Sequence, residues 1–448
     1  MAVLLRGRRA LVLVSAVGLA LVGAAGCSSG TSSNANKDSA ECAAFKQYQG
    51  HDGTTVSIYA TIRDTEADLL EQAWKKFSDC TGIKIAYEGS GEMEAQIQVR
   101  VDGGNAPDLA FFPQPGLMNR FVKSGKLKPA PEKVKAEAAK NWSKDWIGYG
   151  SSGGKFYGAP LGSNVKSFVW YSPKTFKEKG YKIPTTWDEL IGLSNQIAAS
   201  GTKPWCAGIE SGEATGWPAT DWIEDIMLRD QGPDVYDQWV NHQIPFNDPK
   251  VASAVDRAGS ILKNEKFVNA SFGGVKSIAT TSFQEGGLPI LQGKCTLHRQ
   301  ASFYAAQWPK GTKVAEDGDV YAFYFPAVDA SKGKPVLVAG EFVGAFADRP
   351  EVQAVQEYLA SADFANSRAK LGSWVSANKG LDVNNVQNPI DKLSVQILND
   401  PSTVARFDGS DQMPAAVGAG SFWKGMTDWI NGTDTKTALD KIEASWPK

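Results

Sequence analysis

The sequence has few histidines and cysteines and almost no net charge. Its three histidines, His51, His242 and His298, lie far apart, and no cysteine pair has the short spacing of a zinc site, so we expect no metal. Lysine and arginine number 47 against 49 aspartates and glutamates. This balance offers nothing that would attract nucleic acid. Beyond the N-terminal region the chain shows no internal repeat and no low-complexity segment, and nothing in it calls for a cofactor.

At 448 residues, the chain is longer than a single hydrophobic core normally serves. Cores stop growing at roughly 250 to 300 residues, so two or more lobes are expected.

The first 26 residues are typical of a secretion signal. A basic stretch, "RGRR", precedes an apolar run over residues 11–25 that is too short to remain as a membrane-spanning helix. Cys27 follows in "AAGCSSG", which resembles the lipobox where bacteria attach a diacylglyceryl group, with Ala24 in place of the usual leucine. A plain signal peptide with an incidental cysteine is the alternative. We therefore expect lipidation at Cys27, a flexible tether over residues 27–53, and a body held on the outer face of the cytoplasmic membrane.

The four remaining cysteines form an even set, as expected for an oxidising compartment. They are Cys42, Cys80, Cys206 and Cys295. Three pairings are possible, of which Cys42 with Cys80 and Cys206 with Cys295 is favoured because each bridge then stays within one lobe.

Strand and helix signals alternate from Thr54 onward. Residues 56–60 and the stretch "IKIAY" predict strands, and between them Leu70, Trp74 and Phe77 recur at helical spacing. Thr65 can cap this helix and Gly82 can end it. A strand, helix, strand unit implies a parallel sheet. Further helices are expected over residues 92–102, 186–200, 218–230, 250–263, 350–360, 390–399 and 434–446.

Five stretches in order resemble a known family. They are "KKFSDCTGIKI", "GGNAPDLAFF", "PTTWDEL" at 184–190, "SDQMPAAVGAGSFW" at 410–423 and the closing "TALDKIEASWP". Together they are similar to family 1 extracellular solute-binding proteins, the sugar-binding components of bacterial ATP-driven importers. The stretches "PWCAGIESGEATGWPATDW" and "HRQASF" resemble the subgroup that binds alpha-glucosides.

The resemblance implies an α/β, two-lobed periplasmic-binding-protein-like fold of type II. Each lobe would be a mixed sheet with flanking helices, and the ligand cleft would lie between the lobes. Lobe 1 would comprise residues 54–164 and 344–376, and lobe 2 residues 165–343 and 377–448. The chain would cross between them near 164–167, 338–344 and 374–378. Such a protein is a monomer that delivers an oligosaccharide to an ABC permease and has no enzymatic activity.

A sugar site needs aromatic faces and a few fixed hydrogen-bonding groups. By match to the family, Trp423 stacks on a glucose ring, Phe112 and Gln114 face the cleft, and Phe111 points into the core. Asp108 is expected to be structural. The full set of candidate ligand contacts is Ser90, Glu92, Phe112, Gln114, Asn164, Lys166, Glu210, Trp217, His298, Arg299, Glu341, Trp374 and Trp423.

Several candidates have an ordinary structural alternative. Trp423 can be a core aromatic, Ser90 a helix cap, Lys166 a solvated surface charge, and His298 and Arg299 a structural pair. On the helix expected from residue 218, the acids Asp221, Glu224 and Asp225 are interpreted as a solvated face.

The favoured function is reversible capture of an oligosaccharide, such as maltose, trehalose or a longer alpha-glucoside. A glycoside hydrolase is the main rival, because the chain has enough carboxylates to supply an acid pair. A binder of a non-sugar solute is the third possibility.

Overall fold

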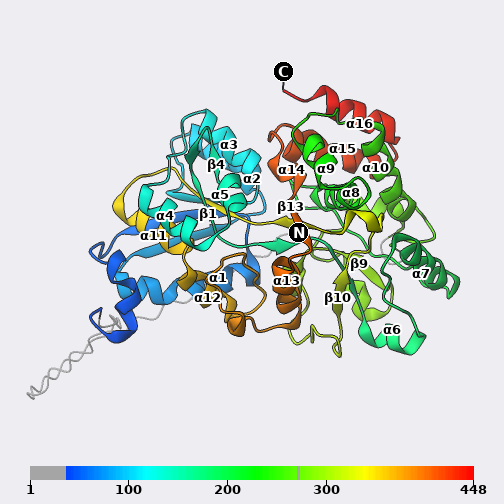
Figure 1. The fold of residues 1–448 in the computed structure, drawn as a ribbon, viewed down its shortest axis with the longest axis horizontal. Coiled ribbons are helices and arrows are strands. Elements are labelled where there is room, and N and C mark those ends of the chain that lie inside the picture. The colour runs from blue at the N-terminus through cyan, green and yellow to red at the C-terminus, as the bar shows by residue number, and fades with distance from the viewer. Residues whose placement is uncertain (1–36, 270–272, 448) are drawn as a thin grey trace, which may run out of the picture.

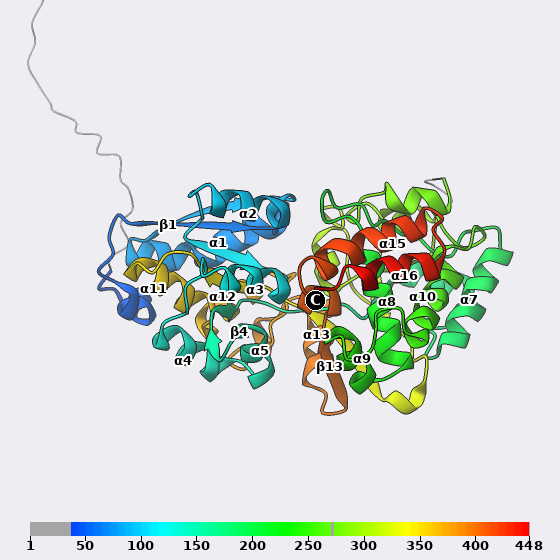
Figure 2. The same cartoon turned by 90° about the horizontal axis from the view of Figure 1, so that it is seen from above.

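The computed structural model describes residues 37–269 and 273–447 and divides the chain into two lobes that lie side by side (Figures 1 and 2). Cys27 and the first part of the expected tether lie outside the described residues. Within the described ranges, no helix combines the length and the apolar character needed to cross a bilayer.

Lobe 1 is built on a five-stranded sheet in the order β2-β1-β3-β12-β6. Its first three members are parallel, as the strand, helix, strand pattern predicted, whereas β12 runs antiparallel to β3 and to β6. A two-stranded hairpin, β4 with β5, stands apart from this sheet. The strands of lobe 1 are β1 (Thr55–Ala60), β2 (Lys84–Gly89), β3 (Leu109–Phe112), β4 (Ser151–Ser152), β5 (Lys155–Phe156), β6 (Gly158–Pro160) and β12 (Phe342–Ala345).

Helices cover the sheet of lobe 1. They are η1 (Ala40–Tyr48), α1 (Asp64–Thr81), α2 (Met93–Asp102), α3 (Pro115–Lys123), α4 (Glu132–Asn141), α5 (Lys144–Tyr149), α11 (Pro350–Leu359) and α12 (Ala362–Ala369). Helix α1 buries Leu70, Trp74 and Phe77, the face that the sequence predicted, and it ends at Gly82 in the left-handed conformation. The predicted cap was wrong, because α1 begins at Asp64 and Thr65 lies inside it.

Lobe 2 contains two three-stranded sheets in place of the single mixed sheet that was expected. Their orders are β10-β8-β9 and β13-β11-β7. The strands are β7 (Asn164–Val165), β8 (Phe168–Tyr171), β9 (Leu297–Arg299), β10 (Tyr321–Tyr324), β11 (Lys334–Ala339) and β13 (Thr403–Phe407).

Most helices of lobe 2 begin and end within a residue or two of a predicted range. Helix α7 is an example: Thr186 and Glu189 form a capping box that fixes its start, and a capping box is a local sequence signal. The helices are α6 (Pro173–Lys179), α7 (Trp187–Ala199), α8 (Trp217–Asp230), α9 (Pro233–Val240), α10 (Pro249–Leu262), α13 (Pro389–Asn399), α14 (Gly409–Gln412), α15 (Trp423–Ile430) and α16 (Thr435–Ala444). Shorter turns are η2 (Val275–Ala279), η3 (Leu288–Gln292), η4 (Ser302–Ala306), η5 (Ala330–Lys332), η6 (Val383–Asn385) and the π-helical turn η7 (Val417–Phe422).

Three segments connect the lobes. Between β6 and β7 the chain leaves the five-stranded sheet and pairs with β11, and between β11 and β12 it returns. The third segment follows α12, where an isolated bridge joins Val375 to Ser163, and leads to α13. The three segments therefore run next to one another at the junction of the lobes, beside the cleft.

The N-terminal region joins lobe 1 earlier than expected. Residues up to 53 were assigned to a flexible tether, yet η1 (Ala40–Tyr48) packs against α1, with Phe45 and Tyr48 edge-on to Phe77. A disulfide joins Cys42 of η1 to Cys80 of α1. The tether prediction was wrong for this part, because an aromatic contact and a covalent link hold it. The second disulfide joins Cys206 to Cys295, so both favoured pairings are confirmed.

Candidate functional site

A cavity of about 170 Å³ lies between the lobes. Lobe 1 lines it with the segments that follow the carboxyl ends of β1, β2 and β3, where ligands collect in parallel sheets. Lobe 2 and the connecting segments supply the opposite wall. The lining residues are Thr61, Ile62, Arg63, Asp64, Glu66, Gly91, Glu94, Pro113, Gln114, Asn164, Lys166, Ser211, Ala214, Trp217, Phe283, Gln284, Phe303, Gln307, Ala339, Gly340, Glu341, Asp411 and Trp423.

All the aromatic rings among these lining residues belong to lobe 2. Trp217 begins α8 and lies edge-on to Phe283, with ring centroids 5.1 Å apart, and 6.1 Å from the ring of Phe303. Trp423 begins α15, is 3% exposed, and donates its indole N–H to Ser410 Oγ at 3.3 Å. Trp217 thus offers a half-buried face, whereas Trp423 is fixed in orientation by its hydrogen bond.

The wall from lobe 1 is polar, and carboxyl groups line the cavity from it and from the connecting segment. Burial, and after it the charge of Glu341, raise the pKa of Glu66 to about 8. Burial also raises the pKa of Glu341, on the connecting segment, to about 7 and that of Glu94 above its usual value. Each of these three side chains is only partly buried. Removal of a carboxyl group from water favours its neutral form.

The start of α1 has an unusual backbone. Asp64 adopts a positive φ of 55°, which side-chain-bearing residues seldom adopt and which costs of order 1–3 kcal/mol. Arg63, Asp64 and Glu66, at and next to this position, all line the cavity.

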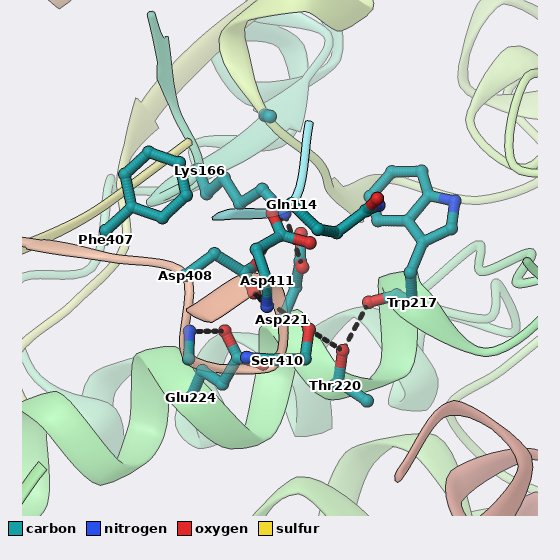
Figure 3. Close-up of polar contacts among 12 residues, drawn as sticks. Gln114, Lys166, Trp217, Thr220, Asp221, Glu224, Phe407, Asp408, Ser410 and Asp411 are labelled. Carbon is teal, nitrogen blue, oxygen red and sulfur yellow. Dashed lines mark hydrogen bonds and ion pairs between the residues drawn. The ribbon is translucent and has the colours of Figure 1, made fainter. Parts of the chain in front are cut away.

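Lys166 is the central charge of the lobe 2 wall (Figure 3). Its Nζ lies 2.9 Å from Asp221 Oδ1 on α8 and 2.6 Å from Asp408 Oδ2 after β13, and the side chain is almost fully buried. Burial alone would lower the pKa of Lys166, but Asp221 and Asp408 raise it well above its usual value. Lys166 therefore stays charged, and its charge is neutralised within the protein.

A second layer of charges lies behind Lys166. Arg299 contacts Asp221 at 3.4 Å and Asp225 at 3.0 Å, and Asp225 also accepts from Ser167 Oγ and pairs with Arg229. The carboxylates of Asp221 and Asp225 are fully buried. The prediction of a solvated acidic face on α8 was therefore wrong, because Arg299, distant in the sequence, and Arg229, on the same helix, pair with these acids.

The segment after β13 connects this layer to Trp423. Glu224 accepts backbone N–H bonds from Gly409 and Ser410 at 2.9 and 3.1 Å, so it too is buried and not solvated. Asp408 Oδ1 accepts from Ser410 Oγ at 2.8 Å, and Ser410 Oγ in turn accepts the indole N–H of Trp423. Figure 3 shows this segment packed on α8 beneath Lys166.

The only grouping of possible metal ligands among the described residues is Asp221, Glu224 and Asp408. Since the ammonium of Lys166 already contacts Asp221 and Asp408, it supplies the positive charge that a metal would otherwise bring.

Six of the predicted ligand contacts line the cavity. They are Gln114, Asn164, Lys166, Trp217, Glu341 and Trp423. Lys166 is buried and paired, so the alternative of a solvated surface charge does not apply. Asp108 is structural as expected, since it accepts from the backbone N–H of Ser57 and pairs with Arg349.

Three predicted contacts from lobe 1 and the junction do not line the cavity. The ring of Phe112 packs in the core against Phe121 and Phe346, with centroids 5.8 and 6.2 Å away. Ser90 accepts from the backbone N–H of Glu92, but it is not the helix cap of the alternative, because Glu92 is the N-cap of α2. Trp374 packs against Gly162 at the junction of the lobes.

Glu92 is exposed at the rim of the cavity and lies close to Gly212 of lobe 2. A Cβ added to Gly212 would be 2.5 Å from Glu92 Oε1.

Three predicted contacts from lobe 2 also have structural partners instead. Glu210 accepts from the N–H of Gly212 at 2.7 Å and shapes its own loop. His298 is buried with Nδ1 3.0 Å from the carbonyl oxygen of Cys206, and burial lowers its pKa to about 4. Arg299 belongs to the charged layer described above.

Sequence reasoning missed two sets of lining residues. The first set lies at the start of α1. The second set is spread over other segments and comprises Glu94, Phe283, Gln284, Phe303, Gln307 and Asp411. The first group could have been found, because the segment after β1 lies at a strand's carboxyl end. Phe283, Gln284, Phe303 and Gln307 carry no comparable local signal.

The lobes touch outside the cavity as well. Helix α3 of lobe 1 meets α14 of lobe 2 at Gly116, where a Cβ would overlap the carbonyl group of Met413 and lie 3.2 Å from Asp411 O. The two lobes are therefore in direct contact next to the cavity.

Comparison with known proteins gives consistent matches. Residues 61–367 match the family model of the bacterial extracellular solute-binding proteins. The osmoprotective compounds-binding protein GgtB of Synechocystis sp. is 41% identical over 400 residues, 89% of this chain and 93% of that protein. The alpha-glucosides-binding periplasmic protein AglE of Rhizobium meliloti is 37% identical over 411 residues, 89% of this chain and 88% of that protein.

Among solved structures, the bacterial solute receptor AcbH, described as preferring β-D-galactopyranose, superposes with a TM-score of 0.74. It is 20% identical and covers 87% of this chain and 98% of its own. A chitin oligosaccharide binding protein gives a TM-score of 0.73 at 18% identity, covering 87% and 97% of the two chains. At these identities the structural likeness is evidence for the fold alone. It agrees with the two-lobed fold that the sequence led us to expect.

Proposed function

Because this chain belongs to the family of bacterial extracellular solute-binding proteins, we propose that it captures an alpha-glucoside between its lobes and delivers it to the permease of an ABC importer. Proteins of this family bind solutes and are not enzymes, so the glucoside is released unchanged.

The observation that carries this proposal is the composition of the two walls. All the aromatic rings among the lining residues, Trp217 and Trp423 included, belong to lobe 2, whereas lobe 1 contributes carboxyl and amide groups such as Glu66 and Gln114. A pyranose ring has an apolar face that packs on aromatics and hydroxyls that bond to fixed polar groups. Charged acceptors form hydrogen bonds roughly twice as strong as neutral ones.

The size of the cavity and the names of the similar proteins restrict the range of possible ligands. About 170 Å³ is below the roughly 300–1,000 Å³ usual for small-molecule sites, which favours a short glucoside such as trehalose or maltose over a long one. The two similar proteins are named for alpha-glucosides and for osmoprotective compounds. A short glucoside fits both names.

Tryptophan fluorescence and calorimetry with trehalose, maltose and maltotriose test the proposal. Binding of at least one sugar should change the emission of the two cavity tryptophans, and Trp217→Phe should reduce that change. Labelled sugar recovered after incubation should be intact. A panel in which no glucoside binds, or in which monosaccharide is released, would contradict the proposed function.

We propose further that Cys27 carries the lipid anchor. The lipobox-like "AAGCSSG" supports this, and η1 at the outer end of lobe 1 places the chain's entry away from the cavity (Figure 1). Cys27→Ala should release the protein from membranes into the medium and abolish labelling by radioactive palmitate. Retention of the variant in the membrane fraction would argue against the anchor.

A further inference from the structure

The cavity has more acidic than basic groups. Its charged lining residues are Arg63, Asp64, Glu66, Glu94, Lys166, Glu341 and Asp411. Both cations among these described residues have partners. Lys166 is held by Asp221 and Asp408, and Arg63 Nε lies 3.6 Å from Asp64 Oδ2 at the rim. Among the described residues, Glu66, Glu94, Glu341 and Asp411 form no ion pair within 4 Å, although Lys166 lowers the pKa of Glu341 and of Asp411 from a greater distance.

Glu66 and Glu341 line the same cavity from different elements. Glu66 lies in the first turns of α1, and Glu341 lies on the connecting segment between β11 and β12. The charge of Glu341 raises the pKa of Glu66. Arg368 on α12, which does not line the cavity, lowers the pKa of Glu66, and Lys166 lowers that of Glu341. Among the described residues, Gln307 Nε2 is the side-chain donor to Glu66, at 3.5 Å.

A third acceptor in the cavity has no partner. Gln114 is 4% exposed, and its Oε1 accepts no hydrogen bond, although its Nε2 donates to Glu94 Oε1 at 3.4 Å. A buried acceptor without a partner costs about 1–3 kcal/mol, unless a ligand supplies the donor. Figure 3 shows this side chain extending over Asp411 toward Trp217.

We propose that the cavity takes glucosides that carry a protonated amine, with the ammonium group between Glu66 and Glu341, and that it rejects glucosides that carry a phosphate or carboxylate. This inference rests on the proposed function, since it names a substrate class for the same cavity.

The chemistry of an ammonium group fits this arrangement. It offers three donors, which Glu66, Glu341 and Gln114 can accept, and it favours the neighbourhood of an aromatic face such as that of Trp217. A cation between the two carboxyls makes their ionised forms more stable, so protons leave them when the amine binds. An anionic substituent would instead meet groups of like charge, and juxtaposed like charges exclude a ligand.

The test compares derivatives of one parent sugar, chosen as the glucoside that binds best in the panel above. Calorimetry at pH 7.5 measures the dissociation constants of the parent, of its 2-, 4- and 6-amino-deoxy derivatives and of its 6-phosphate. At least one amine should bind tenfold more tightly than the parent, and the phosphate at least tenfold more weakly. Repeating the amine titration in buffers of different ionisation enthalpy should show proton release.

Variants assign the effect to the carboxyl pair. In Glu66→Gln and in Glu341→Gln the ratio of the parent's to the amine's dissociation constant should fall toward one. Asp68→Asn, an exposed acid on the same helix, is the matched control and should leave the ratio unchanged.

Each outcome decides. If the parent binds and no amine binds as tightly, the inference is wrong and the proposed function stands. If an amine binds tightly but both variants keep the full ratio, the assignment to Glu66 and Glu341 is wrong. If neither the parent nor any amine binds, the proposed function itself fails.

Discussion

Replacing Gly116 by alanine should prevent the lobes from meeting as they do in this structure. The residue lies in the first turn of α3, and an added Cβ would overlap the backbone carbonyl of Met413, with the carbonyl carbon only 3.1 Å away. Backbone atoms cannot rotate away as a flexible side chain can. Since non-bonded carbon atoms prefer about 3.5–4.0 Å, the lobes must part by about 1 Å at this point.

A separation of this size is enough to weaken ligand binding. Hydrogen bonds near 2.9 Å become longer than the 3.5 Å limit when stretched by 1 Å, and a ligand held by both lobes loses part of its contacts. Apparent affinity falls in proportion to the population of the binding-competent state. A penalty of about 1.5–3 kcal/mol on the closed state corresponds to roughly 10- to 150-fold weaker binding.

The assay is calorimetric titration with the best-binding glucoside, together with thermal unfolding. Gly148→Ala in α5 is the matched control, because its added Cβ meets nothing within 4 Å. Gly116→Ala should lose affinity while keeping its unfolding temperature within a few degrees, and Gly148→Ala should change neither by much. Wild-type affinity in Gly116→Ala would show that the contact between α3 and α14 is not part of the ligand-bound state.

Three further predictions concern the site and its support. Lys166→Met should lower the free energy of unfolding by about 3–5 kcal/mol in urea titrations, because it leaves Asp408 buried without its cation and leaves Asp221 with Arg299 alone; a loss below 1 kcal/mol would contradict the pairing. Trp423→Ala should weaken glucoside binding tenfold or more in calorimetry, through loss of an aromatic face worth about 1.5–3 kcal/mol, and unchanged affinity would remove Trp423 from the site. Burial lowers the pKa of His298 to about 4 from an unfolded value near 6.5, so the contribution of neutral His298 to stability is complete above pH 6.5 and falls as the pH drops to 4. The difference in unfolding free energy between wild type and His298→Gln should therefore shrink from pH 6.5 to pH 4, and a constant difference would refute this prediction.

Local patterns predicted the elements better than they predicted the contacts. Helical spacing identified the buried face of α1, and the turn residues placed its end at Gly82. Alternation failed at β3, where Phe111 was expected inside and Phe112 at the cleft. That strand lies between β1 and β12 with all four of its residues buried, so it has no exposed face for alternation to reveal.

Most of the charged layer of lobe 2 could not be predicted from neighbouring residues. Asp225 has a local partner in Arg229, one helical turn later, but Asp221 has none on its helix, and an unpaired acid is normally solvated. Their other partners, Lys166 and Arg299, are 55 and 74 to 78 residues away in the sequence. Only the folded chain brings these groups together. The match to the family placed Trp423 and Gln114 at the cavity, but it misplaced Phe112.

Under the proposed function, the confinement of the aromatic lining residues to lobe 2 gives the two halves different evolutionary freedom. Ring faces are much alike among hexoses, so Trp217 and Trp423 would then serve many sugars without change. Substitutions among the short polar side chains opposite can then redirect the preferred ligand step by step. A lineage could acquire a new nutrient through one lobe while its grip on pyranose rings persists in the other.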